Sequence, residues 1–231
     1  MENPKERISA RRLWVGTVLA ILAAAVAWGL VKGGDYTTKQ KATRTFTIDE
    51  DFTKVRKIMV RTNAAKEIVT MGGDSEFVDQ HWKDADVETG GENIGEALLS
   101  SVLSSDPDWK LELDGTLQVR TLDKYIGQSV VTLKQHVEIT PNQIESKVEL
   151  AKGSERLLGY GMNTRLFREG EQTKVDLELM QEIKTDAPWF AHSIADRRVR
   201  ASAEKALANQ ESAMRQLIED NADKAGLFPL R

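Results

Sequence analysis

The chain has 231 residues, and 32 Lys and Arg against 36 Asp and Glu give it a formal net charge of -4. Both signs are interspersed beyond the N-terminus, so the sequence lacks the basic stripe of a nucleic-acid-binding protein and we expect no nucleic-acid partner. There is no cysteine, which excludes disulfides, thiolate nucleophiles and cysteine-ligated metals. His81, His136 and His192 are far apart in sequence and match no metal-ligand spacing, so we expect no metal site.

The N-terminal region combines a basic tail at residues 1–12 with an apolar stretch at residues 13–32. This stretch is long enough to cross a hydrocarbon core of about 30 Å as a helix. Trp14 and Trp28 lie near its ends, where indoles favour the headgroup region. Ala25-Val26-Ala27 also fits a signal-peptide cleavage site, so a cleaved leader is the alternative. The length between the tryptophans favours a retained single-pass transmembrane helix.

The residues in and around this segment predict its orientation and its partners. Basic residues cluster more tightly before the segment than after it. This places the N-terminus in the cytoplasm and the rest of the chain on the periplasmic side of the inner (cytoplasmic) membrane. Ala23, Ala24 and Ala27 would let another helix approach closely in lipid. We therefore expect two kinds of partner besides a ligand, the bilayer itself and other membrane-protein subunits.

The rest of the chain divides into three parts. A polar run at residues 33–42 is typical of a linker that lifts a domain off the membrane. Residues 43–226 form one domain with its own core, and residues 227–231 form a tail.

The domain begins with one strand and two short helices. Phe46 and Ile48 alternate with threonines, as on a half-buried strand. An acidic cluster at residues 49–51 can accept bonds from the first amides of a helix, and a second helix ends at Gly72-Gly73. A further helix is predicted at residues 92–105.

From residue 109 the pattern changes to that of an antiparallel sheet. Residues 109–113 and 116–122 flank Asp114-Gly115, which is a strong hairpin signal. Four alternating runs with short turns follow, and together they predict a meander with one apolar face. The apolar positions of these runs are Val131, Leu133, Val137, Ile139, Ile144, Val148, Leu150, Leu158, Tyr160, Met162, Leu166, Val175, Leu177, Leu179 and Ile183.

The pattern of the C-terminal part predicts one long amphipathic helix. Apolar residues recur every three or four positions from Pro188 to Gly226, which predicts a helix of about 35 residues. Pro188 suits a first helical turn and Asp186 is available as its cap. Alanines on the apolar face favour packing across a curved sheet over a coiled-coil seam.

This order of elements resembles the helix-grip fold of the SRPBCC (START, polyketide cyclase, lipid transport) superfamily. The resemblance covers roughly residues 43–225 and is carried by "TFTIDEDFTKVRKIM" at the start and by the last strand, "PWFAHSIADRRVR" and the long helix at the end. It implies an α+β domain in which a curved antiparallel sheet wraps the C-terminal helix around an apolar cavity. It also implies an apolar ligand such as a lipid, a quinone or a pigment, with no required cofactor.

No catalytic residue stands out, because the sequence holds no glycine-rich phosphate loop, nucleophile or clear acid and base pair. We expect a domain that acts without catalysis, either as an accessory subunit of a membrane complex or as a binder of an apolar molecule. A cyclase-type enzyme and a secreted lipid carrier are the alternatives. The expected cavity residues, each of which could instead be filled core, are Val131, Leu133, Val137, Tyr160, Met162, Leu177, Trp189 and Phe190.

Overall fold

The computed structural model describes residues 33–83, 110–122 and 127–223. The predicted transmembrane helix at 13–32, with Ala23, Ala24 and Ala27, and the predicted helix at 92–105 lie outside these ranges. Within them, no helix has both the length and the apolar character that crossing a bilayer requires.

Seven antiparallel strands form one curved sheet in the order β1-β7-β6-β5-β4-β3-β2. The first and last strands pair along their whole length, from Gly34 opposite Ala187 to Ile48 opposite Thr173. The strands are β1 (Gly34–Ile48), β2 (Ser75–Trp82), β3 (Leu111–Thr121), β4 (Val130–Ile139), β5 (Gln143–Lys152), β6 (Leu157–Glu169) and β7 (Gln172–Ala187).

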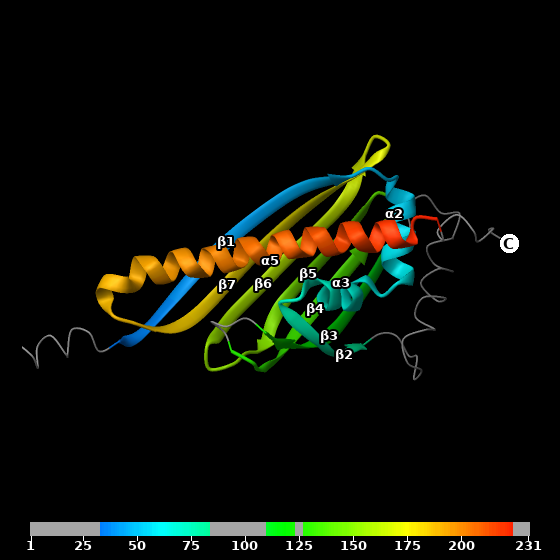
Figure 1. Cartoon of the computed structure of the whole chain (residues 1–231). Helices are drawn as coiled ribbons and strands as arrows, with labels where there is room; N and C mark the ends of the chain where they lie inside the picture. Colours follow the sequence, from blue (N-terminus) through cyan, green and yellow to red (C-terminus); the bar gives the residue numbers. More distant parts are fainter. Residues whose placement is uncertain (1–32, 84–109, 123–126, 224–231) are drawn as a thin grey trace, which may run out of the picture.

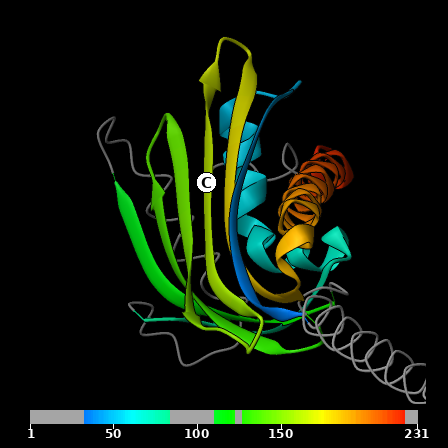
Figure 2. The same ribbon diagram turned by 90° about the vertical axis from the view of Figure 1, so that its left-hand side faces the viewer.

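The helices lie on the concave side of this sheet (Figures 1 and 2). Two short helices, α2 (Phe52–Arg61) and α3 (Ala64–Gly72), follow β1. A short 3-10 helix, η1 (Trp189–Ala191), follows β7 and leads into the long α5 (His192–Asn221), which crosses the sheet. The predicted α+β helix-grip architecture of the domain is confirmed.

Local signals explain how the short helices begin and end. Asp51 caps α2, since its carboxylate accepts a hydrogen bond from the Thr53 amide at 2.8 Å. Gly73 ends α3 with a positive φ of 72°, which glycine adopts without steric cost. Arg56 is buried and donates from Nη1 to the carbonyl oxygens of Thr140 and Pro141, at 3.1 and 2.9 Å. This arginine fastens α2 to the β4–β5 turn.

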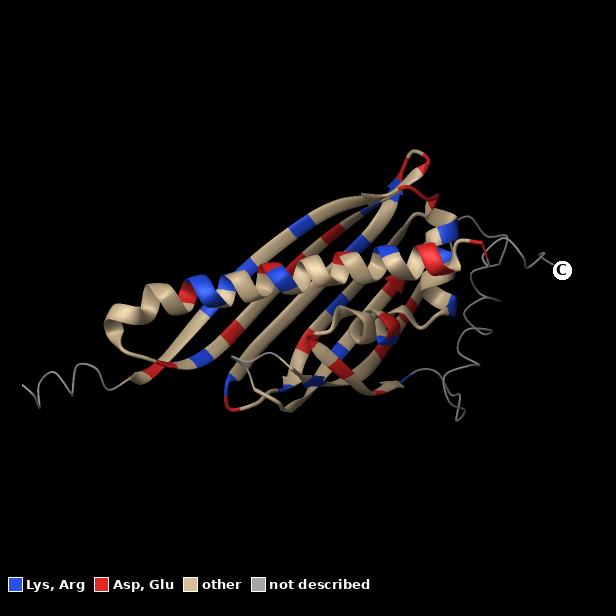
Figure 3. Cartoon of the chain, viewed as in Figure 1, with Lys and Arg blue, Asp and Glu red and all other residues tan. Residues whose placement is uncertain are grey.

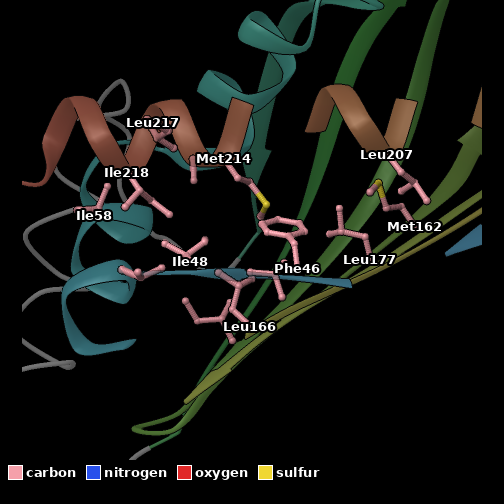
Figure 4. Packing of buried hydrophobic residues seen from close by; sticks show 14 of the residues in the cluster. Phe46, Ile48, Ile58, Met162, Leu166, Leu177, Leu207, Met214, Leu217 and Ile218 are labelled. Atoms are coloured by element: carbon pink, nitrogen blue, oxygen red, sulfur yellow. The ribbon is translucent and has the colours of Figure 1, made fainter. Parts of the chain in front are cut away.

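Large side chains fill the core where the second half of α5 meets β1, β6, β7 and α2. Leu217 and Ile218 lie there against Phe46, Ile48 and residues of the strands beneath (Figure 4). These side chains are almost completely buried, so this part of the interior is closely packed.

The predicted linker at residues 33–42 is wrong, because Gly34–Ile48 is a single continuous strand. The polar residues of this segment do not suggest a strand. Thr38 and Ala42 are nevertheless buried on the same face as Phe46 and Ile48, at the even spacings that a strand requires. A strand at the edge of a sheet can be largely polar, since its backbone bonds to β7 hold it in place whatever the side chains are.

The predicted hairpin at Asp114-Gly115 is also wrong, because both residues lie inside β3. Gly115 pairs with Trp82 of β2. A Cβ at this position would stand 2.7 Å from the His81 carbonyl oxygen and 2.7 Å from Trp82 Cε3. The glycine therefore makes room for an indole ring from the neighbouring strand.

The long C-terminal helix is confirmed, with different limits. α5 has 30 residues rather than about 35, and its N-cap is Ala191, with no side-chain cap bond. Asp186 is exposed in β7 and does not cap a helix. The extended conformation of Pro188, with a ψ of 153°, separates this strand from η1.

Candidate ligand-binding cavity

A cavity of about 330 Å³ lies between the concave face of the sheet and the helices α2, α3 and α5. The strands β3, β4 and β5 form much of its wall, and further side chains come from β2, β6 and β7. Most of the lining is apolar, and its aliphatic and aromatic members include Met59, Ile68, Val69, Trp82, Leu113, Leu117, Val119, Val131, Leu133, Val137, Ile139, Ile144, Val148, Leu157, Tyr160, Met162, Leu179 and Met214.

Several of the helix residues that line the cavity have small side chains, which leave space in front of the strands. Ala64 and Ala65 of α3 and Ser202 and Ala206 of α5 all line it. These short side chains do not reach the sheet as the larger ones of the filled core do. Together with larger lining residues such as Ile68 and Met214, they leave a space that close packing would otherwise fill.

Five of the expected cavity residues line the cavity, namely Val131, Leu133, Val137, Tyr160 and Met162. The other three do not. Leu177 is buried in the filled core, and Trp189 and Phe190 are 68% and 52% exposed. The turn through Pro188 carries these two aromatic side chains away from the sheet before α5 begins, so the expectation that they line the cavity is wrong.

Tyr160 brings a polar group into the apolar cavity. Its hydroxyl donates to the Met162 sulfur at 3.4 Å, and a thioether is a weak acceptor. Burial raises the pKa of Tyr160 to about 12, because the phenolate would lose its hydration there. The phenol is therefore neutral at physiological pH, with a proton that a stronger acceptor could take in a hydrogen bond.

Gln181 lies directly opposite Tyr160 in the β6–β7 register and also lines the cavity. Its side chain is buried, and Oε1 has no hydrogen-bond partner within the described residues. An unsatisfied buried acceptor costs about 1–3 kcal/mol, so a ligand group that donated to this oxygen would remove that cost. Tyr160 and Gln181 thus offer a donor and an acceptor side by side.

A second glutamine behaves differently. Gln135 of β4 is buried and lines the cavity, but its Oε1 accepts a hydrogen bond from Gln80 Nε2 at 3.0 Å. This bond crosses from β4 to β2, over the intervening strand β3. Gln135 therefore has a structural partner, which Gln181 Oε1 lacks.

Asp74 is the one carboxylate among the described lining residues, which include no histidine. Its oxygens accept from Lys205 Nζ at 2.8 Å and from Asn209 Nδ2. Both donors lie on α5, so Asp74 fastens the turn after α3 to the helix.

Neither glutamine is among the residues predicted to line the cavity, although the alternation of both strands marks them. Gln135 stands between Leu133 and Val137, and Gln181 between Leu179 and Ile183, each on the apolar face of a strictly alternating strand. A polar residue on the buried face of a strand is more informative than the apolar residues around it. Trp82 had no such signal, since only the pairing of β2 with β3 brings it to the cavity.

No protein-family model and no curated protein sequence matches this chain. Similar folds occur among solved structures at low identity. The Zhui aromatase/cyclase from Streptomyces sp. R1128 is 12% identical with a TM-score of 0.46, and the match covers 82% of this chain and 99% of that one. A START superfamily protein from Mycobacterium smegmatis is 14% identical with a TM-score of 0.43, covering 78% and 97%. A protein of unknown function from Staphylococcus aureus is 6% identical with a TM-score of 0.49, covering 81% and 98%. At such identities, the strand order and the position of α5 are what establish a helix-grip fold for this chain.

Proposed function

We propose that this protein binds one apolar molecule with a hydrogen-bonding group, without transforming it, while a transmembrane helix at residues 13–32 holds it at the membrane. The observation that carries the proposal is the apolar cavity with the unsatisfied Gln181 oxygen beside the Tyr160 hydroxyl. Binding of this kind combines apolar walls for affinity with a few polar groups for orientation.

The size of the cavity limits the ligand. A volume of about 330 Å³ is at the lower end of the range of ligand pockets, roughly 300–1,000 Å³. It suits one ring system or part of an acyl chain, so a quinone ring or a lipid chain fits this volume better than a large tetrapyrrole pigment.

The two polar groups further define the ligand chemistry. A carbonyl oxygen on the ligand would accept from the Tyr160 hydroxyl more strongly than the Met162 sulfur does. A hydroxyl or N–H group would donate to Gln181 Oε1. A molecule with a carbonyl and a neighbouring donor would satisfy both residues at once.

Binding is favoured over catalysis by the chemistry of the lining. Asp74, its one carboxylate among the described residues, is already bonded to Lys205 and Asn209, and the raised pKa of Tyr160 makes its phenol a poor proton donor in a reaction. A cyclase-type enzyme is the alternative. It would require this neutral phenol to polarise a ligand carbonyl.

The predicted location at the membrane fits the binding of an insoluble molecule. A ligand-binding domain on the periplasmic side of the inner membrane would take up or release an insoluble molecule beside the bilayer. Ala23, Ala24 and Ala27 would pack the anchor against another subunit, which would add an accessory role within a membrane complex.

Ligand extraction from the full-length protein tests the proposal. We expect mass spectrometry of detergent-purified chain to reveal about one lipid-soluble molecule per chain, and Val137→Phe to lose it because a larger ring occupies the cavity. Lys134→Phe is the matched control, since Lys134 lies exposed on the opposite face of β4. Equal ligand content in both variants would contradict binding in the cavity. A ligand that changes mass on incubation with the protein would favour the enzyme.

A further inference from the structure

One end of the molecule gathers exposed apolar side chains. Trp189 is 68%, Phe190 52% and Ile194 42% exposed, and the rings of Trp189 and Phe190 meet edge to face at 5.9 Å. We call these three residues, on η1 and the first turn of α5, the aromatic tip. Large apolar side chains at such exposure, adjacent in sequence and space, are typical of an interaction surface.

The aromatic tip lies where the described chain begins. Gly34 pairs with Ala187 at the end of β7, and a Cβ on Gly33 would stand 3.4 Å from the carbonyl carbon of Asp186. Trp189 follows Ala187 by two residues. Figure 1 shows the start of β1 and the start of α5 at the same end of the fold.

We propose that the aromatic tip inserts into the interfacial region of the lipid bilayer that residues 13–32 cross. This rests on the membrane tether of the proposed function. Gly33 directly follows the predicted span, and each extended residue covers at most about 3.6 Å. The end of the span, and with it the membrane surface, is therefore close to Gly33 and to the tip beside it.

The chemistry of the tip fits the headgroup region. Residues 189–195 carry no charged side chain, and Figure 3 shows uncharged first turns of α5 followed by charged ones. Indole rings favour the bilayer interface. Arg197 and Arg198 are exposed about one turn beyond Ile194, where their guanidinium groups can reach lipid phosphates.

Two of the acidic residues at this end are paired with other residues of the fold. Asp35 is paired with Lys184 at 2.6 Å, and Asp196 is engaged by residues of β1. Asp186 is a further exposed carboxylate beside the tip, and the exposed Glu155 lies near Lys184. The tip itself is uncharged, and the cations of α5 lie behind it.

The tip is also fixed rigidly to the strand that leads from the tether. The ring of His192 stacks on Tyr36 with centroids 3.7 Å apart, and the Tyr36 hydroxyl donates to Asp196 Oδ1 at 2.9 Å. Hydrogen bonds from Thr38 and Tyr36 lower the pKa of Asp196, so it stays an ionised acceptor. Docking would therefore set the orientation of the whole domain on the membrane.

The absence of cysteine allows a direct test with one introduced thiol. Ser193→Cys places an environment-sensitive fluorophore beside the tip without removing an apolar side chain. Glu171→Cys is the control, at the opposite end of the 16-residue β7, about 50 Å away. Full-length proteins would be reconstituted in vesicles of equal amounts of phosphatidylethanolamine and phosphatidylglycerol, with a quencher attached to the lipid.

We expect a blue-shifted emission and loss of most of the fluorescence at position 193, with neither at position 171. Adding Trp189→Ser and Phe190→Ser to the Ser193→Cys protein should restore the signal, and because both aromatic residues are exposed the fold should be unchanged. A chain that floats with the vesicles but shows no quenching at 193 would overturn the docking and leave the tether standing. A chain that does not float would overturn both, while ligand extraction would still report on the cavity.

Discussion

The two halves of the interior differ although the same sheet supports both. Under the second half of α5, large side chains from α2, β1, β6 and β7 fill the space (Figure 4). Among them, Phe52 and Leu166 are at most 1% exposed. Under α3 and the middle of α5, the helix residues that face the sheet include the small Ala65, Ser202 and Ala206 beside larger ones such as Ile68, and a cavity remains. The alternation of the strands is alike in both halves. The two halves therefore differ in the helix side chains that meet the sheet and not in the pattern of the strands.

The largest expected difference comes from the same substitution made in each half. Leu166→Ala in the filled core should destabilise the fold by about 3–5 kcal/mol, because closely packed neighbours cannot close the new cavity. Leu113→Ala in the cavity wall should cost only about 1 kcal/mol, since that side chain already faces open space. Urea denaturation of the two variants measures both values, and equal losses would mean that the halves are packed alike.

A larger side chain in the half of the interior that holds the cavity, which we call the hollow half, should make its packing resemble that of the filled half. Ala206→Leu adds three carbon atoms that point from α5 into the cavity. At about 0.8 kcal/mol per buried carbon, less about 0.5–1 kcal/mol for the lost rotamer freedom of leucine, it should stabilise the fold by about 1–2 kcal/mol. Bound ligand should decrease at the same time. Ala201→Leu, at an exposed position of the same helix, should change neither the free energy of unfolding nor the ligand content.

The two buried glutamines separate a ligand-binding residue from a structural one. Gln181→Leu removes an unsatisfied acceptor, so it should raise the stability of the empty protein by about 1 kcal/mol and weaken ligand binding about tenfold. Gln135→Leu should instead destabilise the fold by about 1–3 kcal/mol, because Gln80 Nε2 loses its acceptor. Thermal unfolding measures both stabilities and ligand titration measures the affinity of Gln181→Leu. A shift of the stability of both variants in the same direction would contradict this contrast.

The last contrast concerns the pH dependence of the half that holds the cavity. Burial raises the pKa of the Tyr160 phenol from 10 in the unfolded chain to about 12 in the fold, so above pH 10 the unfolded chain holds fewer protons. The stabilising contribution of the neutral phenol is therefore fully present below pH 10 and is lost as the pH rises toward 12. Tyr160→Phe should flatten this alkaline decline in urea denaturation, and an unchanged slope would show that Tyr160 is not enclosed.

Much of the fold could be predicted from the sequence, because strands and helices with one apolar face have their own periods. The strict alternation of β7 and the helical spacing of α5 identify both elements. The alternation at Phe46 and Ile48 identifies the end of β1, but its polar first part could not be found in this way, since its pairing with β7 depends on backbone groups. Gly115 was misplaced for a similar reason, because only the neighbouring Trp82 explains a glycine inside a strand.

The sequence by itself determined the helix-grip order of elements and placed apolar side chains on one face of the sheet. Only the tertiary structure decided which of these side chains are filled core and which line a cavity, because that depends on the size of the residues that meet across the interface. It also turned Trp189 and Phe190 outward, through a bend at Pro188, and brought Gln181 beside Tyr160. Contacts between residues far apart in the chain fix these features, and periodicity within one element carries no information about them.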